Sequence, residues 1–526
     1  MTDLVAVALE EGLGHHQAGR LAEAEMCYRR LLAIDPDHPD GLHLLGVVAY
    51  QAGQPDEAAA LIGRAIDRLP LIADYHSNLG NALVAMGRLA EAELCYRTAL
   101  RLKPDFPEAH NNLGNTVRDL DRPAEAVACY RAVLRLLPNY ALAHNNLGNA
   151  LRDLGRSDEA EGCYREALRL RPELAEAHNN LGIALRDRAR LDEAEAAYRM
   201  ALALRPDYPE AHHNLATLLL LAGRLTEAWP EYEWRGLVKG NGYPSARGFP
   251  HPRWGGEVLG ARVLLVHAEQ GFGDTLQFCR YVPLAGARGR VVLEVPGGLV
   301  RLVSGLPGVE RVVATGDALP DFDVECPLLS LPGVFGTTLE TIPASVPYLA
   351  ADPTAVAMWR ARLAALPGLR VGLVWAGDPR RYMGGGLAID RRRSLVLEQL
   401  APLVGIEGVS FVSLQKGEAA AQACPEGLVL HDWTGELGDF ADTAGLVAAL
   451  DLVISVDTSV AHLAGALGKP VWLLNRYDTC WRWLLGRDDS PWYPSLRQFR
   501  QTKPGEWGAV LDAVRTALVA RREGAA

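Results

Sequence analysis

The sequence predicts a stack of paired α-helices over its first half, followed by an α/β region of two halves that each hold a parallel sheet. Two observations predict this architecture. Small, aromatic and proline residues recur with a fixed 34-residue period up to about residue 238, the length of one helical hairpin repeat. Beyond residue 260, strand-length apolar runs alternate with helical patterns, as in chains that build parallel sheets.

Four kinds of position keep the 34-residue step in phase, and each has a packing role. Glycine or alanine lets two antiparallel helices approach closely, an aromatic ring fills the space beside them, and proline ends the second helix. The series are Pro36, Pro70, Pro104, Pro138, Pro172 and Pro206; Ala24, Ala58, Ala92, Ala126, Ala160, Ala194 and Ala228; Tyr28, Tyr96, Tyr130, Tyr164, Tyr198 and Tyr232; and Gly46, Gly80, Gly114, Gly148 and Gly182. The pattern predicts an α-solenoid of about seven tetratricopeptide-type repeats with a groove for binding.

One asparagine per repeat occupies the same position of the first helix, and we call this row the asparagine ladder. Its members are Asn78, Asn112, Asn146, Asn180 and Asn214. Other polar residues follow at offsets of three and seven, which places them on one helical face, so the ladder is not expected to hold the helices together. An amide both donates and accepts hydrogen bonds, so a spaced row suits an extended peptide backbone. The alternative is that these asparagines cap turns or only solvate the groove.

The repeat phrase from Ala109 to Asn115 resembles the repeats of O-GlcNAc transferase. The asparagine ladder of that family binds the backbone of the acceptor protein. The resemblance therefore implies that an acceptor protein or peptide lies along the groove of the repeats.

Six apolar runs in the second half are expected to be strands. They are 262–267, 291–295, 370–375, 409–414, 452–456 and 471–474. We predict the repeat array at 1–238, a Gly- and Pro-rich linker at 239–260, an N-terminal Rossmann-like half at 261–350 and a C-terminal Rossmann-like half at 351–526.

The run from Ile454 to Pro470 has the pattern of a strand, a tight turn carrying hydroxyls, and a helix whose free N–H groups suit a phosphate. It resembles the donor motif of bacterial heptosyltransferases, glycosyltransferase family 9. The resemblance implies a GT-B fold and a nucleotide-sugar substrate. Thr458 and Ser459 would bind its phosphates, Asp457 would order the turn or bind the sugar, and His462 would face the same site. The alternative is an ordinary strand-to-helix junction with a Ser or Thr cap.

The turn after the first strand, Gly271 to Leu276, resembles the first loop of the same family. In that loop an aspartate acts as the base, which places Gly273 in the donor site and makes Asp274 the candidate catalytic residue. An inverting transfer needs one base to deprotonate the acceptor hydroxyl. The alternative is that Asp274 caps a helix.

Cations are expected where the family neutralises the phosphates of the donor. Arg393 is the first choice and Arg391 the second, and a solvated charge run is the alternative. The segment 382–389 between them and the preceding strand is longer than usual for the family. Gln415 and Lys416 follow a strand and are candidates to bind the base or ribose. The aromatic segment 481–494 is equally compatible with sugar stacking and with a domain core.

Composition narrows the classes of partner. The net charge of −11 argues against a generic nucleic-acid binder. The longest apolar stretch, near Leu215 to Ala222, is too short to span a membrane. No basic leader is visible at the start, and the eight cysteines contain no C-x-x-C pair, so we expect a cytoplasmic protein. No cofactor and no metal are expected, because the family neutralises phosphate with side chains and helix ends.

Taken together, these resemblances imply a glycosyltransferase that moves a sugar from a nucleotide sugar to a Ser or Thr of a protein held by the repeats, by an inverting, metal-independent reaction. Bacterial repeat-containing glycosyltransferases combine both parts, and some modify flagellin, which makes flagellin one candidate acceptor. Two alternatives stay open: heptosyltransferase-like transfer to a lipid or polysaccharide, and a repeat scaffold without enzymatic activity.

Overall fold

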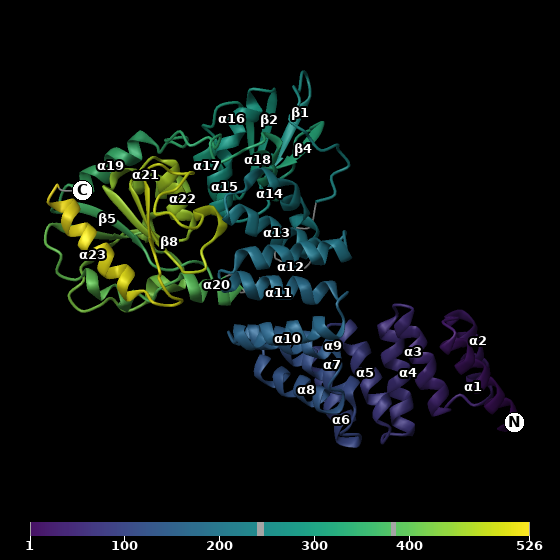
Figure 1. Ribbon diagram of the computed structural model, residues 1–526. Coiled ribbons are helices and arrows are strands. Elements are labelled where there is room, and N and C mark those ends of the chain that lie inside the picture. Colours follow the sequence, from purple (N-terminus) through teal and green to yellow (C-terminus); the bar gives the residue numbers. More distant parts are fainter. Residues whose placement is uncertain (1, 239–246, 380–385, 525–526) are drawn as a thin grey trace. The chain divides into compact units, whose positions relative to one another are not determined.

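The computed structural model describes residues 2–238, 247–379 and 386–524. The chain forms two compact units, residues 1–206 and 207–526, and Figure 1 follows their elements in sequence order. The first unit is a helical solenoid and the second contains two parallel sheets, so the predicted fold class, a repeat solenoid followed by an α/β region compatible with GT-B, is confirmed.

The first unit consists of helices that pack in consecutive antiparallel pairs. They are α1 (Thr2–Gln17), α2 (Leu21–Ile34), α3 (Pro39–Gln51), α4 (Pro55–Arg68), α5 (Ala73–Ala85), α6 (Leu89–Leu102), α7 (Pro107–Asp119), α8 (Pro123–Leu136), α9 (Ala141–Asp153), α10 (Ser157–Leu170), α11 (Ala175–Asp187) and α12 (Leu191–Leu204). Each pair occupies one 34-residue period, as the registers predict.

The glycine and tyrosine registers meet inside each pair. The ring of Tyr164 is fully buried beneath Gly148, where an added Cβ would lie 2.5 Å from a ring carbon. That is too close for any side chain, so glycine is required at this position for the two helices to approach. The alanine register is buried beside the same rings, for example at Ala160.

The second unit opens with helices α13 (Pro209–Leu221) and α14 (Leu225–Tyr232), which complete the repeats. The first sheet contains β1 (Val263–His267), β2 (Arg290–Val295), β3 (Val309–Ala314) and β4 (Val324–Pro327), in the order β3-β2-β1-β4. The second contains β5 (Leu369–Val374), β6 (Val409–Ser413), β7 (Leu430–Asp432), β8 (Leu452–Val456), β9 (Val471–Asn475) and β10 (Leu496–Arg500), in the order β10-β9-β8-β5-β6-β7. All pairings are parallel, and the six predicted strands are present to within a residue at each end.

Helices connect and cover these strands. They are α15 (Phe272–Phe278), α16 (Val282–Gly286), α17 (Val300–Val303), α18 (Leu331–Val334), α19 (Pro353–Leu363), α20 (Gly386–Arg393), α21 (Phe440–Ala449), α22 (Ser459–Ala466) and α23 (Gly508–Arg522). The second sheet lies among α19, α21, α22 and α23 (Figure 1). Trp375, Ile454 and Val514 are buried together between this sheet and α23, which makes one of its cores.

Strand order determines where a ligand can bind. In both sheets the chain leaves the first strand on one side and returns on the other: β1 lies between β2 and β4, and β5 lies between β6 and β8. At such a point the loop after the first strand runs to one side of the sheet, and the loop after the neighbouring strand runs to the other side. The two loops leave a crevice between them at the carboxyl ends of the strands. The sequence-predicted loops after β1, β5 and β8 all lie at these two points.

The predicted linker is only partly described, because 239–246 lie outside the described residues. Its remainder packs on the first sheet: Trp254 is 1% exposed and its backbone N–H donates to the carbonyl of Glu325 at 2.8 Å. The segment 382–389 likewise starts outside the described residues, and α20 begins at Gly386. The proposed domain boundaries at 238, 260 and 350 stay predictions.

Candidate functional site

Two adjoining cavities open at the carboxyl ends of the strands in the second unit. The small cavity has a volume of about 420 Å³ and the large cavity about 1000 Å³. Five residues line both: Phe272, Gly377, Asp378, Thr458 and Ser459. The turn between β8 and α22 therefore lies where the two cavities meet.

The predicted site residues of the α/β region divide between the two cavities. Those in the small cavity are Gly273, Asp274, Arg393, Asp457, Thr458, Ser459 and His462. Those in the large cavity are Arg391, Gln415, Lys416, Thr458 and Ser459. Residues that are more than 180 positions apart in the sequence thus come together.

The turn after β8 leaves its hydroxyls available. Thr458 occupies the N-cap position of α22, but its side chain makes no hydrogen bond to the helix. Its hydroxyl lies instead 3.0 Å from the hydroxyl of Ser455. The side-chain cap that was the alternative for this turn is therefore absent, and the first N–H groups of α22 receive nothing from Thr458. This arrangement suits an anion at the helix end.

Gly273 lies where the helix after β1 of the first sheet meets the helix after β8 of the second sheet. A Cβ at this position would lie 3.0 Å from Cδ2 of His462 and 3.6 Å from Cα of Ser459. The first turn of α15 therefore packs directly on the first turn of α22, and the next residue of α15, Asp274, faces the small cavity.

Asp274 is held by an ion pair rather than by its own helix. Gly271 is the N-cap of α15, and the Asp274 carboxylate accepts a hydrogen bond from the guanidinium of Arg482 in the second half. Both side chains are largely buried, at 13% and 12% exposure. The helix-cap alternative for Asp274 finds no support in these contacts.

Arg393, the first choice for a phosphate ligand, already holds several partners. Its guanidinium donates to the carbonyl of Asp378 at 2.9 Å, to the carbonyl of Asp457 at 3.3 Å, and to the carboxylate of Asp390 at 3.1 Å. It ties the loop after β5 to the loop after β8 and lies in the wall of the small cavity. Arg391 is exposed and lines the large cavity.

Gln415 is likewise occupied by the backbone. Its side-chain oxygen accepts from the N–H groups of Trp375 and Ala376 at 3.1 and 2.9 Å, and its amide donates to the carbonyl of Ala376 at 3.0 Å. This residue fixes the spacing of β5 and β6 beneath the large cavity. Lys416 donates to the carbonyl of Leu437 at the edge of the same cavity.

The sequence interpretation missed two cations of the small cavity, Arg476 and Arg482. Arg476 directly follows β9, so its place after a strand was a usable signal. Arg482 lies in the aromatic segment, whose other members mostly form core: Trp483 and Tyr493 are fully buried. The core interpretation of that segment is therefore correct for these two rings, while Trp481 lines the cavity.

Asp457 is ionised in spite of its burial. Burial by itself would raise its pKa, but the positive charges of His462, Arg393, Arg476 and Arg482 lower the pKa below the usual range. The arginines provide the part of this effect that persists when His462 is neutral. A buried anion surrounded by arginines can order them around a ligand.

His462 is a neutral group at the centre of the site. Its ring stacks on Trp483 at 5.0 Å, and its Nδ1 lies 2.9 Å from the hydroxyl of Tyr493. Burial lowers the pKa of His462 to about 4, against the opposing effect of Asp457. It can therefore exchange hydrogen bonds with a ligand at neutral pH without adding charge.

The lowered pKa of His462 predicts how the stability of the fold depends on pH. The unfolded chain protonates His462 below about pH 6.5 and the folded protein only near pH 4, so folding loses stability as the pH falls through that window, by up to about 3 kcal/mol. His462→Gln should remove this component. Denaturant unfolding of both proteins at pH 7.5 and pH 4.5 measures it, and equal pH dependence of the two proteins would contradict the assignment.

The asparagine ladder forms part of a chain of hydrogen bonds in the first unit. Each side-chain amide donates to the oxygen of the next, at 2.9–3.5 Å, and Asn78 lies 2.8 Å from a ring nitrogen of His43. The order is Asn179, Asn180, Asn145, Asn146, Asn111, Asn112, Asn81, Asn78 and His43. The expectation that the ladder takes no part in holding helices together is thus wrong, because these amides link neighbouring repeats.

The ladder residues keep capacity for a ligand. Asn112, Asn146 and Asn180 are partly exposed, whereas their chain partners Asn145 and Asn179 are buried. Each amide offers two donors and two acceptor positions, and the chain uses about half of them. Asn214, the last ladder position, lies on α13 in the second unit, where its neighbours His213 and Thr217 line the small cavity.

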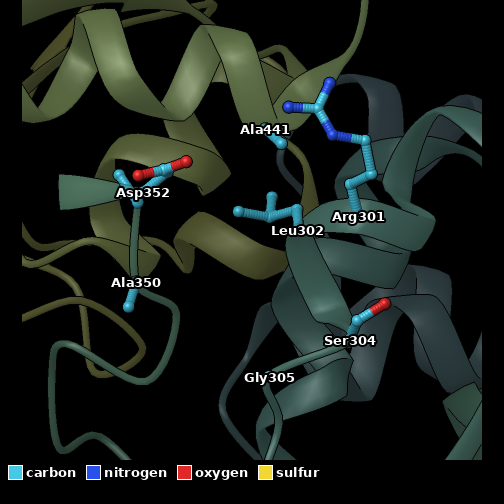
Figure 2. A pocket seen from close by; sticks show the side chains of 8 residues that line it. Arg301, Leu302, Ser304, Gly305, Ala350, Asp352 and Ala441 are labelled. Atoms are coloured by element: carbon cyan, nitrogen blue, oxygen red, sulfur yellow. The ribbon is translucent and has the colours of Figure 1, made fainter. Parts of the chain in front are cut away.

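A third cavity, also of about 420 Å³, lies between α17 and residues 350–352. Figure 2 shows Arg301 and Leu302 of α17 on one side and Ala350 and Asp352 on the other. The guanidinium of Arg301 bonds Asp439 at 3.0 Å and Asp442 at 3.2 Å, and so links the first half to α21 of the second. This contact braces the two halves beside the large cavity.

Neither a membrane-spanning helix nor a cluster of metal ligands occurs among residues 2–238, 247–379 and 386–524. None of the helices among them is both long and apolar enough to cross a membrane. Within the same ranges, no three His, Cys, Asp or Glu side chains are grouped so that they could hold a metal ion.

Known proteins match chiefly the repeats. Models of the tetratricopeptide repeat match residues 15–77, 80–121, 105–173, 145–209 and 180–235. Residues 15–235 are therefore tetratricopeptide repeats, and an α/β region follows them. Protein FlbA of Caulobacter vibrioides is a distant homologue, 31% identical over 296 residues, which cover 51% of this chain and 48% of FlbA. The chain thus spans about half the length of the curated relative it matches.

Solved structures of repeat proteins are similar to part of the chain. A tetratricopeptide repeat protein from Parabacteroides merdae is 16% identical, covering 44% of this chain and 91% of its own, with a TM-score of 0.38. PilF of Pseudomonas aeruginosa is 22% identical, covering 40% of this chain and 96% of its own, with a TM-score of 0.37.

Proposed function

We propose that the second unit is an inverting, metal-independent glycosyltransferase that uses a nucleotide sugar. One observation carries the proposal: the Thr458–Ser459 turn and Asp274 meet in one cavity at the carboxyl ends of two parallel sheets. A helix end that accepts an anion and a carboxylate that can take a proton are the two groups such a transfer needs.

The large cavity is the proposed nucleotide site. Its volume, about 1000 Å³, is at the upper end of the range for small-molecule sites. The nucleoside would occupy the end near Lys416, with its phosphates directed to Ser459 and α22. The sugar would then enter the small cavity, where His462 and Asp457 contact it and Asp274 faces the acceptor hydroxyl.

A protein is the proposed acceptor, because the repeats extend into the site itself. Helix α13 is a repeat helix, carries the last ladder position Asn214, and lines the small cavity with His213 and Thr217. The backbone of an acceptor held at Asn214 would therefore lie beside the small cavity, which Asp274 lines. Flagellin is one candidate acceptor. All eight cysteines are free, which supports a reducing compartment such as the cytoplasm.

The two other functions make different use of the same residues. Transfer to a lipid or polysaccharide would leave the ladder amides without a ligand, and a scaffold would need neither the buried Asp274–Arg482 pair nor the open turn at Thr458. The arrangement of these groups favours the protein glycosyltransferase.

Donor binding should depend on the turn after β8. Changing Thr458 and Ser459 together to alanine removes two hydroxyls that donate to phosphate, each worth roughly 1.5–3 kcal/mol, so affinity for the donor should fall at least about tenfold. Calorimetry with the nucleotide that binds the wild type measures this. Ser304→Ala, outside both of these cavities, is the control and should bind the donor as the wild type does. Unchanged affinity of the double variant would contradict the assignment of the turn to the donor phosphates.

A further inference from the structure

Arg482 carries a hydrogen-bond donor for which the described residues offer no partner. One terminal nitrogen of its guanidinium bonds Asp274, the other lies 3.1 Å from the sulfur of Cys480, and the planar group stacks on Trp481 at 4.4 Å. Its Nε–H is buried and has no acceptor among the residues that the structure describes. A buried unpaired donor is costly, so such a group commonly marks a ligand position.

The position of Arg482 fits an anion that binds at the Thr458–Ser459 turn. Arg482, Thr458 and Ser459 line the same cavity, and the charge of Arg482 acts on both Asp457 and His462. Arg393 bonds two backbone carbonyls, and Arg476 pairs with Asp478 at 3.6 Å. Of these three arginines, Arg482 is the one that contacts Asp274.

The pair with Arg482 conflicts with the role proposed for Asp274. A carboxylate oxygen that accepts a hydrogen bond from a guanidinium is not free to take the proton of an acceptor hydroxyl. A diphosphate that enters the cavity brings more negative charge than one carboxylate and can compete for the same guanidinium.

We propose that Arg482 is shared between Asp274 and the diphosphate of the donor. In the empty site it holds the carboxylate; when a nucleotide sugar binds, its Nε–H and a terminal N–H donate to phosphate oxygens, and Asp274 is released to the acceptor hydroxyl. This inference rests on the proposed function and adds a residue that couples donor binding to the base.

The test is the binding of nucleotides to the full-length protein. UDP, GDP, CDP and ADP are titrated against the wild type by calorimetry, and the corresponding nucleosides by NMR. Arg482→Lys keeps the charge but loses the Nε–H and the planar fork, so the nucleoside diphosphate should bind about tenfold more weakly while the nucleoside binds as before. Arg482→Gln should lose more. Asp274→Asn should tighten diphosphate binding several-fold, because the competing carboxylate is gone.

The control is a matched Arg–Asp pair at the opposite ends of the strands. Arg370 bonds Asp451 at 2.6 and 2.9 Å, outside both cavities, so Arg370→Lys should leave both affinities unchanged. Wild-type affinity of Arg482→Lys for the diphosphate would overturn the inference and leave the proposed function standing. Equal or weaker binding by Asp274→Asn would overturn the sharing. If no nucleotide binds the wild type, the proposed function fails, and the inference with it.

Discussion

Asp274→Asn should lower turnover by about 10²–10⁴-fold, the usual contribution of a general base. The amide is nearly isosteric with the carboxylate but cannot take the proton of the acceptor hydroxyl. Donor binding should not weaken, because the base acts only in the transfer step, and it should tighten if the carboxylate competes with the donor for Arg482. Initial rates of sugar transfer at saturating donor, together with calorimetry of the donor, separate the two effects.

An exposed aspartate supplies the control. Asp317→Asn lies on the surface in the turn after β3 and should transfer at the wild-type rate. If Asp274→Asn keeps more than about a tenth of the wild-type rate, another residue is the base.

Changing Asn112, Asn146 and Asn180 together to alanine should reduce protein glycosylation at sub-saturating acceptor by about one to three orders of magnitude. Each lost amide contact to a peptide backbone is worth roughly 0.5–1.5 kcal/mol. Hydrolysis of the donor by water should not change, because that reaction needs only the second unit. Comparing protein labelling with donor hydrolysis in the same sample measures the separation.

The chain of amides requires a second variant, since the triple change also breaks bonds between repeats and should lower the stability of the first unit. Changing Asn111, Asn145 and Asn179 to alanine breaks the same chain and leaves the ladder amides in place. Both variants should unfold at lower temperature, but only the ladder variant should lose glycosylation. Equal loss in both would show that the ladder acts through repeat stability and not through a peptide.

The repeats could be predicted almost completely from the sequence, because their determinants are local. Gly148 and Tyr164 recur with the period of one hairpin and meet within it. Strands such as β8 were predictable for a similar reason: a buried parallel strand is a short, continuous apolar run. The loops after β1 and β8 then placed Asp274 and Thr458 near the same edge.

Pairings between distant residues could not be predicted. Arg482 and Asp274 are 208 residues apart, and no local pattern joins them. Gln415 and Arg393 are of types that suit a ligand, yet their contacts show that much of their hydrogen-bonding capacity serves the backbone around the cavities. The hydrogen-bonded chain of asparagines could not be predicted, because residue offsets within one helix give no information on contacts with the neighbouring repeat.

The central claim is that the second unit transfers sugar from a nucleotide sugar to protein. The most direct measurement incubates the wild type and Asp274→Asn with a panel of nucleotide sugars and bacterial lysate, and detects modified peptides by mass spectrometry. We predict sugar on Ser or Thr residues with the wild type and one class of nucleotide sugar, and its absence with the variant. Binding of a nucleotide sugar without any transfer to protein, or equal labelling by both proteins, would contradict the claim.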